Sequence, residues 1–127
     1  MLAVLAVAQW IVRIAGVVNL LLGLLFWTGD ARGLVPVHML LGVVLVIALW
    51  ALAAVSTQQG VPVGLAAGAA IMGIIVLWLG LAQGGLMPGG AHWVIQALHL
   101  ITGMAAVGIG EAIGGRVRRA RLAAASS

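Results

Sequence analysis

The sequence contains no cysteine, so disulfides, thiolate metal sites and cysteine nucleophiles are all excluded. Charge is also scarce: Asp30 and Glu111 are the only acidic residues, and six arginines are the only basic residues apart from histidine. No carboxylate pair for acid–base hydrolysis, no Ser-His-Asp set and no phosphate-binding glycine loop is evident. Hydrolases, kinases and nucleotide-dependent enzymes are therefore disfavoured.

Apolar residues are what the chain has in abundance, with 65% of its 127 residues hydrophobic and 6% charged. A soluble domain of this size needs far more polar surface. A membrane span needs about 20 apolar residues, so the long apolar runs predict an all-α membrane protein, a bundle of four transmembrane helices. We expect one transmembrane domain over residues 1–115, with helices at about 4–27, 36–55, 62–83 and 91–113.

Most of the positive charge lies in the segment 116–127, which contains Arg116, Arg118, Arg119 and Arg121. Gly114 and Gly115 are expected to end the fourth helix just before it, because glycine commonly follows a helix C-terminus. A basic cluster beside a span is typical of the cytoplasmic side and suits anionic headgroups, whereas the footprint is too small to favour nucleic acid. We expect a multi-pass protein of a bacterial-type inner (plasma) membrane, with both termini cytoplasmic.

The two halves of the chain resemble each other. Two glycines of the first expected helix recur in the third at an offset of 57 residues (73 − 16 and 80 − 23). A histidine–glycine pair of the second helix recurs in the fourth at an offset of 61 residues (99 − 38 and 103 − 42). The matched residues are Gly16, Gly23, His38 and Gly42 in the first half and Gly73, Gly80, His99 and Gly103 in the second. This predicts two parallel helical-hairpin repeats, with the two histidines facing each other towards the outer leaflet.

The repeated pattern His-x-x-x-Gly favours a cofactor. A residue four positions along a helix lies on the same face one turn away, so Gly42 and Gly103 remove bulk directly beneath His38 and His99. A porphyrin standing edge-on between two helices needs that clearance, and two imidazoles from facing helices can supply both axial ligands of haem iron. The sequence therefore predicts one bis-histidine haem b, although each histidine could instead be a structural or interfacial residue.

With four helices, His38 and His99 on alternate helices and Gly42 and Gly103 beneath them, the chain resembles the four-helix membrane b-type cytochromes. The resemblance covers the architecture of the whole chain through a short motif. It implies a haem-binding electron carrier that exchanges electrons with a membrane quinone or a small oxidant. The larger members of that family usually carry two haems and more histidines than this chain offers.

A third histidine, His92, lies seven residues before His99, about 10 Å further along nearly the same face. It could lie at the membrane interface, hydrogen-bond a haem propionate, or replace His99 as the iron ligand. Gln96 lies between the two histidines on that stripe and could be a second hydrogen-bonding partner of the site or a helix–helix contact.

Two charges fall inside the expected spans, Arg13 in the first helix and Glu111 near the end of the fourth. Because both lie at similar depth and an unpaired charge there is expensive, we expect them to form an ion pair. The alternative is a proton or quinone-headgroup site, with Asn19 one or two turns deeper. The small-residue motifs at Gly64–Gly68 and Gly110–Gly114 allow close packing within the bundle, which we expect, or between copies of the chain.

Two other functions remain open at the level of sequence. The chain could be a cofactor-free accessory subunit that packs through its glycines against a larger membrane assembly, such as a respiratory complex, or against copies of itself. It could also be a small oligomeric transporter, for which Arg13, Asn19, Thr102 and Glu111 offer the only polar path. Whether the protein is an enzyme is not decided by these patterns.

Overall fold

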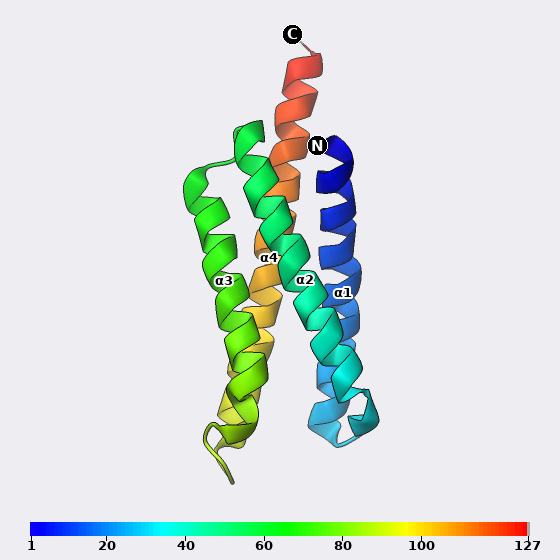
Figure 1. The fold of residues 1–127 in the computed structure, drawn as a ribbon, viewed down its shortest axis with the longest axis vertical. Coiled ribbons are helices and arrows are strands. Elements are labelled where there is room, and N and C mark those ends of the chain that lie inside the picture. The colour runs from blue at the N-terminus through cyan, green and yellow to red at the C-terminus, as the bar shows by residue number, and fades with distance from the viewer. Residues whose placement is uncertain (127) are drawn as a thin grey trace.

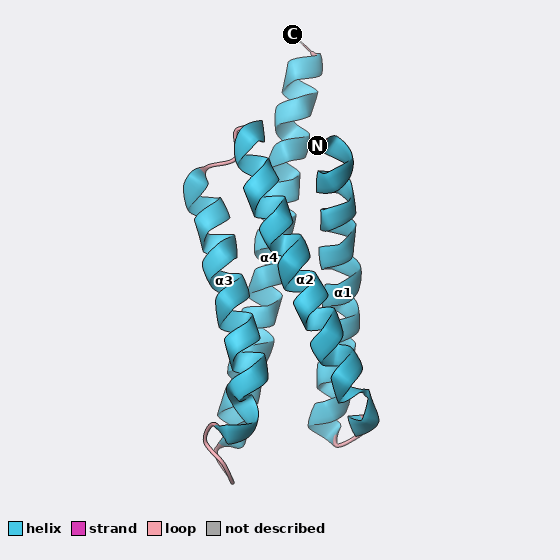
Figure 2. Ribbon diagram, viewed as in Figure 1, coloured by secondary structure: helices cyan, strands magenta, loops and turns pink. Residues whose placement is uncertain are grey.

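A computed structural model of the protein describes residues 1–126, and these form four long α-helices joined by short connections, without any strand (Figures 1 and 2). The helices are α1 Leu2–Thr28, α2 Val35–Ser56, α3 Val63–Ala82 and α4 His92–Ala125. The expected all-helical, four-helix architecture is confirmed, and the first three helices begin and end within two residues of the expected positions. Pro36 lies in the first turn of α2, where its missing N–H is tolerated.

All four helices are long and apolar enough to cross a membrane. Only 17–39% of the residues in each apolar window are buried within the bundle, so most of the apolar surface faces outwards. A soluble monomer rarely exposes apolar patches of that extent, whereas lipid would cover them. Both chain ends and the α2–α3 connection lie at one end of the bundle, here called the terminal end; the α1–α2 and α3–α4 connections lie at the other, the two-loop end (Figure 1).

The packed core lies on the terminal side of the histidines, mainly between α1, α2 and α4. Its largest fully buried apolar side chains are Val12, Val46, Leu49, Leu52 and Ile113. The helix ends are set by glycine where the backbone turns left-handed: Gly29 follows α1 at φ 94°, and its N–H and that of Asp30 bond back to carbonyls in the last turn. These short turns keep neighbouring helices antiparallel.

The fourth helix differs from expectation, because α4 does not end at Gly114 and Gly115 but continues to Ala125 (Figure 1). The two glycines keep helical backbone dihedrals, and Gly114 serves packing instead of capping. Any side chain at Gly114 would collide with the amide of Gln9 on α1. The expected helix end was therefore wrong, and the arginines of residues 116–121 lie on a continuous helix.

Small residues allow close helix contacts at some of the expected places and not at others. A β-carbon on Gly110 would lie 2.9 Å from Val12 Cγ1, so the Gly110–Gly114 motif packs α4 against α1 as expected. Gly64 and Gly68 have nothing within 4 Å of that position, so the expectation of an intrabundle contact was wrong for them. That face of α3 is open in the isolated bundle.

The tightest glycine contact of α3 leads to a stability prediction. A β-carbon on Gly73 would collide with the Trp50 indole and lie 2.9 Å from Val46 Cγ1. The indole is held in place because its Nε1–H donates to the Ala70 carbonyl at 3.2 Å. Gly73→Ala is expected to lower the free energy of unfolding in detergent by about 1–3 kcal/mol, as overpacked cores do.

Gly68→Ala, five residues earlier on the same helix, is the matched control. Its added methyl meets open space, so stability should be unchanged or rise by up to about 1 kcal/mol through helix propensity. Equal destabilisation by both substitutions in a thermal or denaturant unfolding assay would contradict the packing of Gly73 against Trp50.

Candidate functional site

His38 and His99 face each other across the bundle. Their ring centroids are 6.1 Å apart with an interplanar angle of 60°, and both rings are half-buried. His38 lies in the first turn of α2 and His99 about two turns into α4, so the two rings reach the same level from helices that run in the same direction. The predicted approach of these two histidines, 61 residues apart in sequence, is confirmed.

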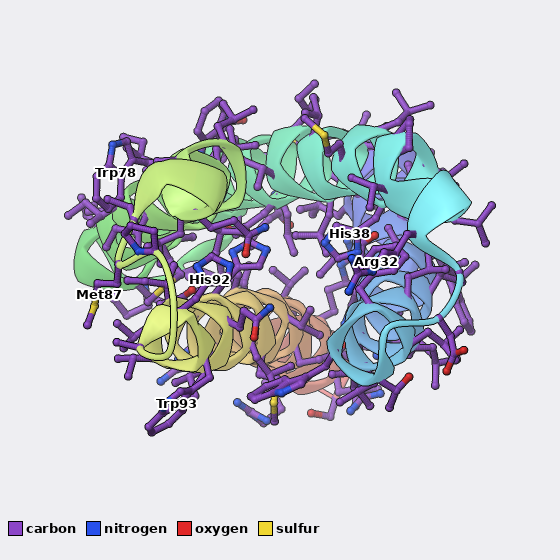
Figure 3. The ribbon with its side chains drawn as sticks, turned by 90° about the horizontal axis from the view of Figure 1, so that it is seen from below. Arg32, His38, Trp78, Met87, His92 and Trp93 are labelled. Atoms are coloured by element: carbon purple, nitrogen blue, oxygen red, sulfur yellow. The ribbon has the colours of Figure 1, made fainter. Side chains whose placement is uncertain are left out.

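Both imidazoles line a cavity of about 840 Å³ that lies between the α1–α2 hairpin and the α3–α4 hairpin. The cavity extends to the two-loop end, where Arg32 and His92 also line it. Figure 3 is seen from that end and shows Arg32, His38 and His92 around the opening between the two hairpins. Its wall is otherwise largely apolar, with leucines, valines and methionines from all four helices.

Each histidine packs over a glycine of the helix that precedes its own. A β-carbon on Gly23 of α1 would lie 3.8 Å from His38 Cε1, and one on Gly80 of α3 would lie 3.2 Å from His99 Cε1. These two glycines make room for the rings, a role that the sequence reasoning did not assign to them. The sequence did contain an indication of this role, because Gly23 and Gly80 occupy equivalent positions in the two halves of the chain.

The two glycines that were assigned to the site, Gly42 and Gly103, both line the cavity. A β-carbon on Gly42 would lie 3.7 Å from the amide of Asn19, and one on Gly103 would meet nothing within 4 Å. Gly103 thus leaves open space one turn from His99, as the expected clearance requires. Their role beneath a bound cofactor stays a prediction.

Asn19 fixes the position of α2 beside the cavity. With its amide in the orientation that satisfies both groups, the nitrogen donates to the His38 carbonyl at 3.1 Å and the oxygen accepts from the Gly42 N–H at 2.9 Å. Phe26 adds an edge-on contact to the His38 ring, with centroids 5.4 Å apart. Thus α1 fixes the backbone of α2 at this level through Asn19 and contacts the His38 ring through Phe26.

The His99 ring is held less completely. Its Nδ1 atom is buried and has no hydrogen-bond partner among residues 1–126. A buried polar atom without a partner costs free energy unless a ligand or water meets it. Thr102, the nearest hydroxyl along α4, bonds instead to the Leu98 and His99 carbonyls of its own helix. The site therefore has a fully buried imidazole nitrogen that residues 1–126 leave without a partner.

His92 and Gln96 also line the cavity, nearer the two-loop end than His99. His92 Nδ1 lies 3.1 Å from the Leu86 carbonyl, a contact that ties the α3–α4 connection to the start of α4. One of the two ring nitrogens of His92 is therefore engaged by the α3–α4 connection. Within residues 1–126 the other ring nitrogen, Nε2, makes no hydrogen bond, so the three roles considered for His92 all stay predictions.

The predicted ion pair between Arg13 and Glu111 is confirmed and lies on the terminal side of the cavity. Arg13 Nε donates to Glu111 Oε1 at 2.6 Å and its terminal nitrogen donates to Oε2 at 2.7 Å, a bidentate geometry. Gln9 Nε2 reaches the same carboxylate at 3.4 Å, and the guanidinium lies 5.2 Å from the centre of the Trp10 ring. The pair joins α1 to α4 and belongs to the frame of the bundle, away from the histidines.

Within the described part of the chain, no group of three or more His, Asp or Glu side chains converges as a metal site. The candidate site therefore consists of His38, His99 and the largely apolar cavity that they line. Comparisons with family models, with curated proteins and with solved structures found no match to this chain.

Proposed function

We propose that the protein is a small membrane b-type cytochrome in which His38 and His99 ligate one haem. The observation that carries the proposal is their approach to 6.1 Å inside a cavity of about 840 Å³. Imidazole–metal bonds are about 2 Å long, so two imidazoles on opposite sides of one metal ion have ring centres roughly 6 Å apart. The ring separation therefore fits two axial ligands of a single iron.

The cavity is suited to a flat, largely apolar macrocycle. Ligand pockets typically have about 300–1,000 Å³, and this one lies within that range. Gly42 and Gly103 on the histidine helices and Gly23 and Gly80 on the other two leave its walls without side chains at four points. The orphaned nitrogen of His99 is a further indication that a ligand completes the site.

Polar groups at the mouth of the cavity suit the acidic edge of haem. Arg32 and His92 both line the cavity at the two-loop end, and arginine is the residue best matched to a carboxylate. Arg32 and His92, with Gln96 as a further hydrogen-bond donor, would be the residues available to the propionates of a bound haem, and Gly42 and Gly103 would leave room for its macrocycle.

Haem iron held by two histidines supplies reversible one-electron transfer. The chain would hold the ring by its two imidazoles, exclude water with its apolar wall and keep the acidic groups at the open end. A single site near one end of the bundle limits electron exchange to that side of the membrane. A quinone or a small oxidant as redox partner is what the resemblance to four-helix cytochromes implies.

The proposal includes the placement of the chain. Two parallel helical-hairpin repeats account for the equivalent contacts of His38 with Gly23 and of His99 with Gly80. The basic residues near the C-terminus favour a cytoplasmic terminal end, which puts the haem near the outer face of a bacterial inner membrane. The partners would then be the lipid bilayer and a redox protein or small molecule, without nucleic acid.

A second candidate, the cofactor-free accessory subunit, is favoured by one observation. Gly64 and Gly68 present an open small-residue face on α3, the kind of surface through which membrane helices associate. Copies of this chain or subunits of a respiratory complex could pack there. A transport path is not favoured, since Arg13 and Glu111 bond to each other and Asn19 bonds to the α2 backbone.

Titration of the detergent-purified protein with haem tests the proposal. We expect saturation at one haem per chain and a Soret band distinct from that of free haem. A double His38→Ala/His99→Ala variant, which keeps the cavity open, is the control for haem that merely partitions into the micelle. Equal uptake by this variant and the natural chain would defeat the proposal and favour the accessory subunit.

The two glycines beneath the rings give a matched pair of substitutions. Gly80→Ala places a methyl 3.2 Å from His99 Cε1 and forces that ring to move by a few tenths of an ångström, whereas Gly23→Ala makes an ordinary 3.8 Å contact with His38. We expect Gly80→Ala to weaken haem binding several-fold more than Gly23→Ala, with similar thermal stability for both apoproteins. The check is haem titration of the two variants in parallel; equal affinities would contradict the closer fit of His99.

A further inference from the structure

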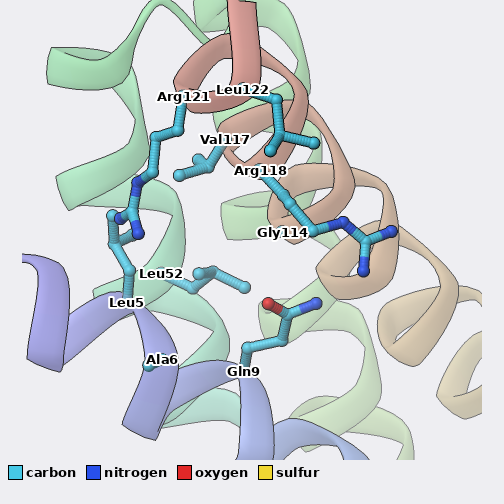
Figure 4. Close-up of a pocket in the computed structure, with 9 residues that line it drawn as sticks. All are labelled: Leu5, Ala6, Gln9, Leu52, Gly114, Val117, Arg118, Arg121 and Leu122. Carbon is cyan, nitrogen blue, oxygen red and sulfur yellow. The ribbon is translucent and has the colours of Figure 1, made fainter. Parts of the chain in front are cut away.

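A second cavity, of about 320 Å³, lies at the terminal end between α1, α2 and α4, far along the bundle from the histidines (Figure 4). Its inner wall is apolar, formed by Leu5, Leu52 and Val117, which are all buried in one core cluster. Arg118 and Arg121 of α4 also line it, and Figure 4 shows their side chains extending to different sides of the view, Arg121 towards Leu5. The cavity therefore has an apolar part and a strongly basic part.

The continuation of α4 past Gly115 puts the two arginines there. Gly114, Val117, Arg118, Arg121 and Leu122 follow the spacing of one helix face, and all of them line the cavity. Val117 is 4% exposed, so this face stays packed on the bundle beyond the expected end of the span. Arg116 and Arg119 fall on the opposite face and do not line the cavity.

Neither of these two arginines forms an ion pair within residues 1–126. The only ion pair among residues 1–126 is that of Arg13 with Glu111, and this carboxylate already accepts two hydrogen bonds from Arg13. The other acidic side chain, Asp30, lies beyond the opposite end of α1. The cavity thus has two guanidinium groups that form no ion pair among residues 1–126, although Glu111, which is bonded to Arg13, also attracts Arg118 electrostatically. Guanidinium groups are well matched to a phosphate.

The depth of the cavity identifies the source of that phosphate. If α4 enters the hydrocarbon layer near His92, a 30 Å layer takes about 20 residues and ends near Ile113. Arg118 and Arg121 then lie about 7–12 Å beyond it, in the headgroup region, with Leu5 beside Val117 at the level of Arg118 and with Leu52 deeper, near the edge of the hydrocarbon layer. Apolar side chains beside and below two cationic groups are the arrangement that a phospholipid would complete.

We propose that this cavity is a binding site for one anionic phospholipid of the leaflet at the terminal end. Its phosphate is held by Arg118 and Arg121, Leu5 and Val117 lie beside the glycerol region, and the upper part of an acyl chain lies along Leu52. Gln9, whose amide lies at the base of the cavity and donates to Glu111 at 3.4 Å, keeps a second N–H for the lipid ester region (Figure 4). The inference goes beyond the proposed function and does not depend on haem.

Native mass spectrometry of the full chain in detergent tests the site, with phosphatidylglycerol and phosphatidylcholine as probes. We expect one phosphatidylglycerol to be retained in preference to phosphatidylcholine. Arg118→Gln/Arg121→Gln should lower its affinity by about tenfold or more, because each arginine near an anionic surface contributes roughly fivefold. Arg116→Gln/Arg119→Gln removes the same charge from the same helix and should change the affinity by less than about threefold.

A second variant tests the apolar part without altering charge. Ala6 lines the cavity and is exposed, so Ala6→Leu fills the space and should lower phosphatidylglycerol retention while the protein remains folded. Equal losses from the two double variants would overturn the proposal, since they indicate diffuse attraction to the basic helix. An unchanged affinity of Ala6→Leu, or displacement of the lipid by millimolar inorganic phosphate, would also overturn it.

Discussion

Replacing His99 by alanine is expected to abolish tight haem binding by the purified protein. His99 would supply one of the two ligands and is the α4 histidine whose ring lies 6.1 Å from that of His38, whereas His92 lies seven residues, or about 10 Å, nearer the two-loop end. A group that only supports a metal ligand already contributes roughly 10- to 100-fold to affinity, so losing the ligand itself should lower affinity by more than about 100-fold. Any residual haem should be five-coordinate and high-spin. Haem titration followed by absorption spectroscopy measures both effects.

The same result is expected for His38→Ala, and His92→Ala is the matched control. His92 is half-buried and lines the same cavity, but its loss should leave the low-spin spectrum intact and lower affinity far less than loss of His99. If His92→Ala instead abolished the low-spin spectrum and His99→Ala did not, the ligand assignment on α4 would be wrong and His92 would be the axial ligand.

The second large effect is expected at the ion pair between α1 and α4. Glu111→Leu removes the carboxylate that accepts both hydrogen bonds from Arg13 and leaves that guanidinium beside apolar helices. Breaking such a pair by removing one partner is strongly destabilising, because the remaining charge is uncompensated. We expect a markedly lower thermal midpoint in detergent and a large loss of membrane-inserted protein.

Removing both charges should restore most of the stability that Glu111→Leu loses. An ion pair replaced by apolar residues of similar size is often neutral or even stabilising, so Arg13→Leu/Glu111→Leu should be more stable than Glu111→Leu alone. Asp30→Asn is the control for loss of an acidic residue, since Asp30 is exposed and only accepts a hydrogen bond from Thr28. Additive losses in the double variant would show that the two side chains act independently, contrary to their bidentate contact.

The sequence was sufficient to predict the four helices, the approach of the two histidines and the ion pair. The last two predictions rest on the scarcity of polar residues. A membrane-spanning chain has few polar side chains, and each must find a partner at its own depth. Arg13 and Glu111 are the only charged residues within the expected helices, so each is the only available partner of the other. The two histidines could be placed at one level because they lie near the starts of helices that run in the same direction.

The contacts of individual glycines could not be predicted, because they depend on which face of each helix points inwards. The hydrophobic pattern does not distinguish a lipid-facing from a core-facing side when nearly every residue is apolar. Gly23 and Gly80 were therefore recognised only as repeated residues, although they are the ones that lie against the histidine rings. For the same reason Gly64 and Gly68 were expected to pack and instead face outwards.

The end of α4 was mispredicted because glycine has two uses that sequence alone does not separate. Gly114 and Gly115 before a basic segment are typical of a helix end, yet Gly114 is the point at which α4 approaches Gln9 most closely. Packing at this position lets the helix continue, and the lipid site proposed above depends on that continuation.

The central claim is that His38 and His99 together ligate one haem, and an oxidised and reduced visible absorption spectrum of the haem-loaded protein tests it most directly. The account predicts a sharp reduced-minus-oxidised spectrum of six-coordinate, low-spin haem b at one haem per chain, lost in both His38→Ala and His99→Ala. A flat difference spectrum after haem addition, or a low-spin spectrum that survives both substitutions, would contradict it.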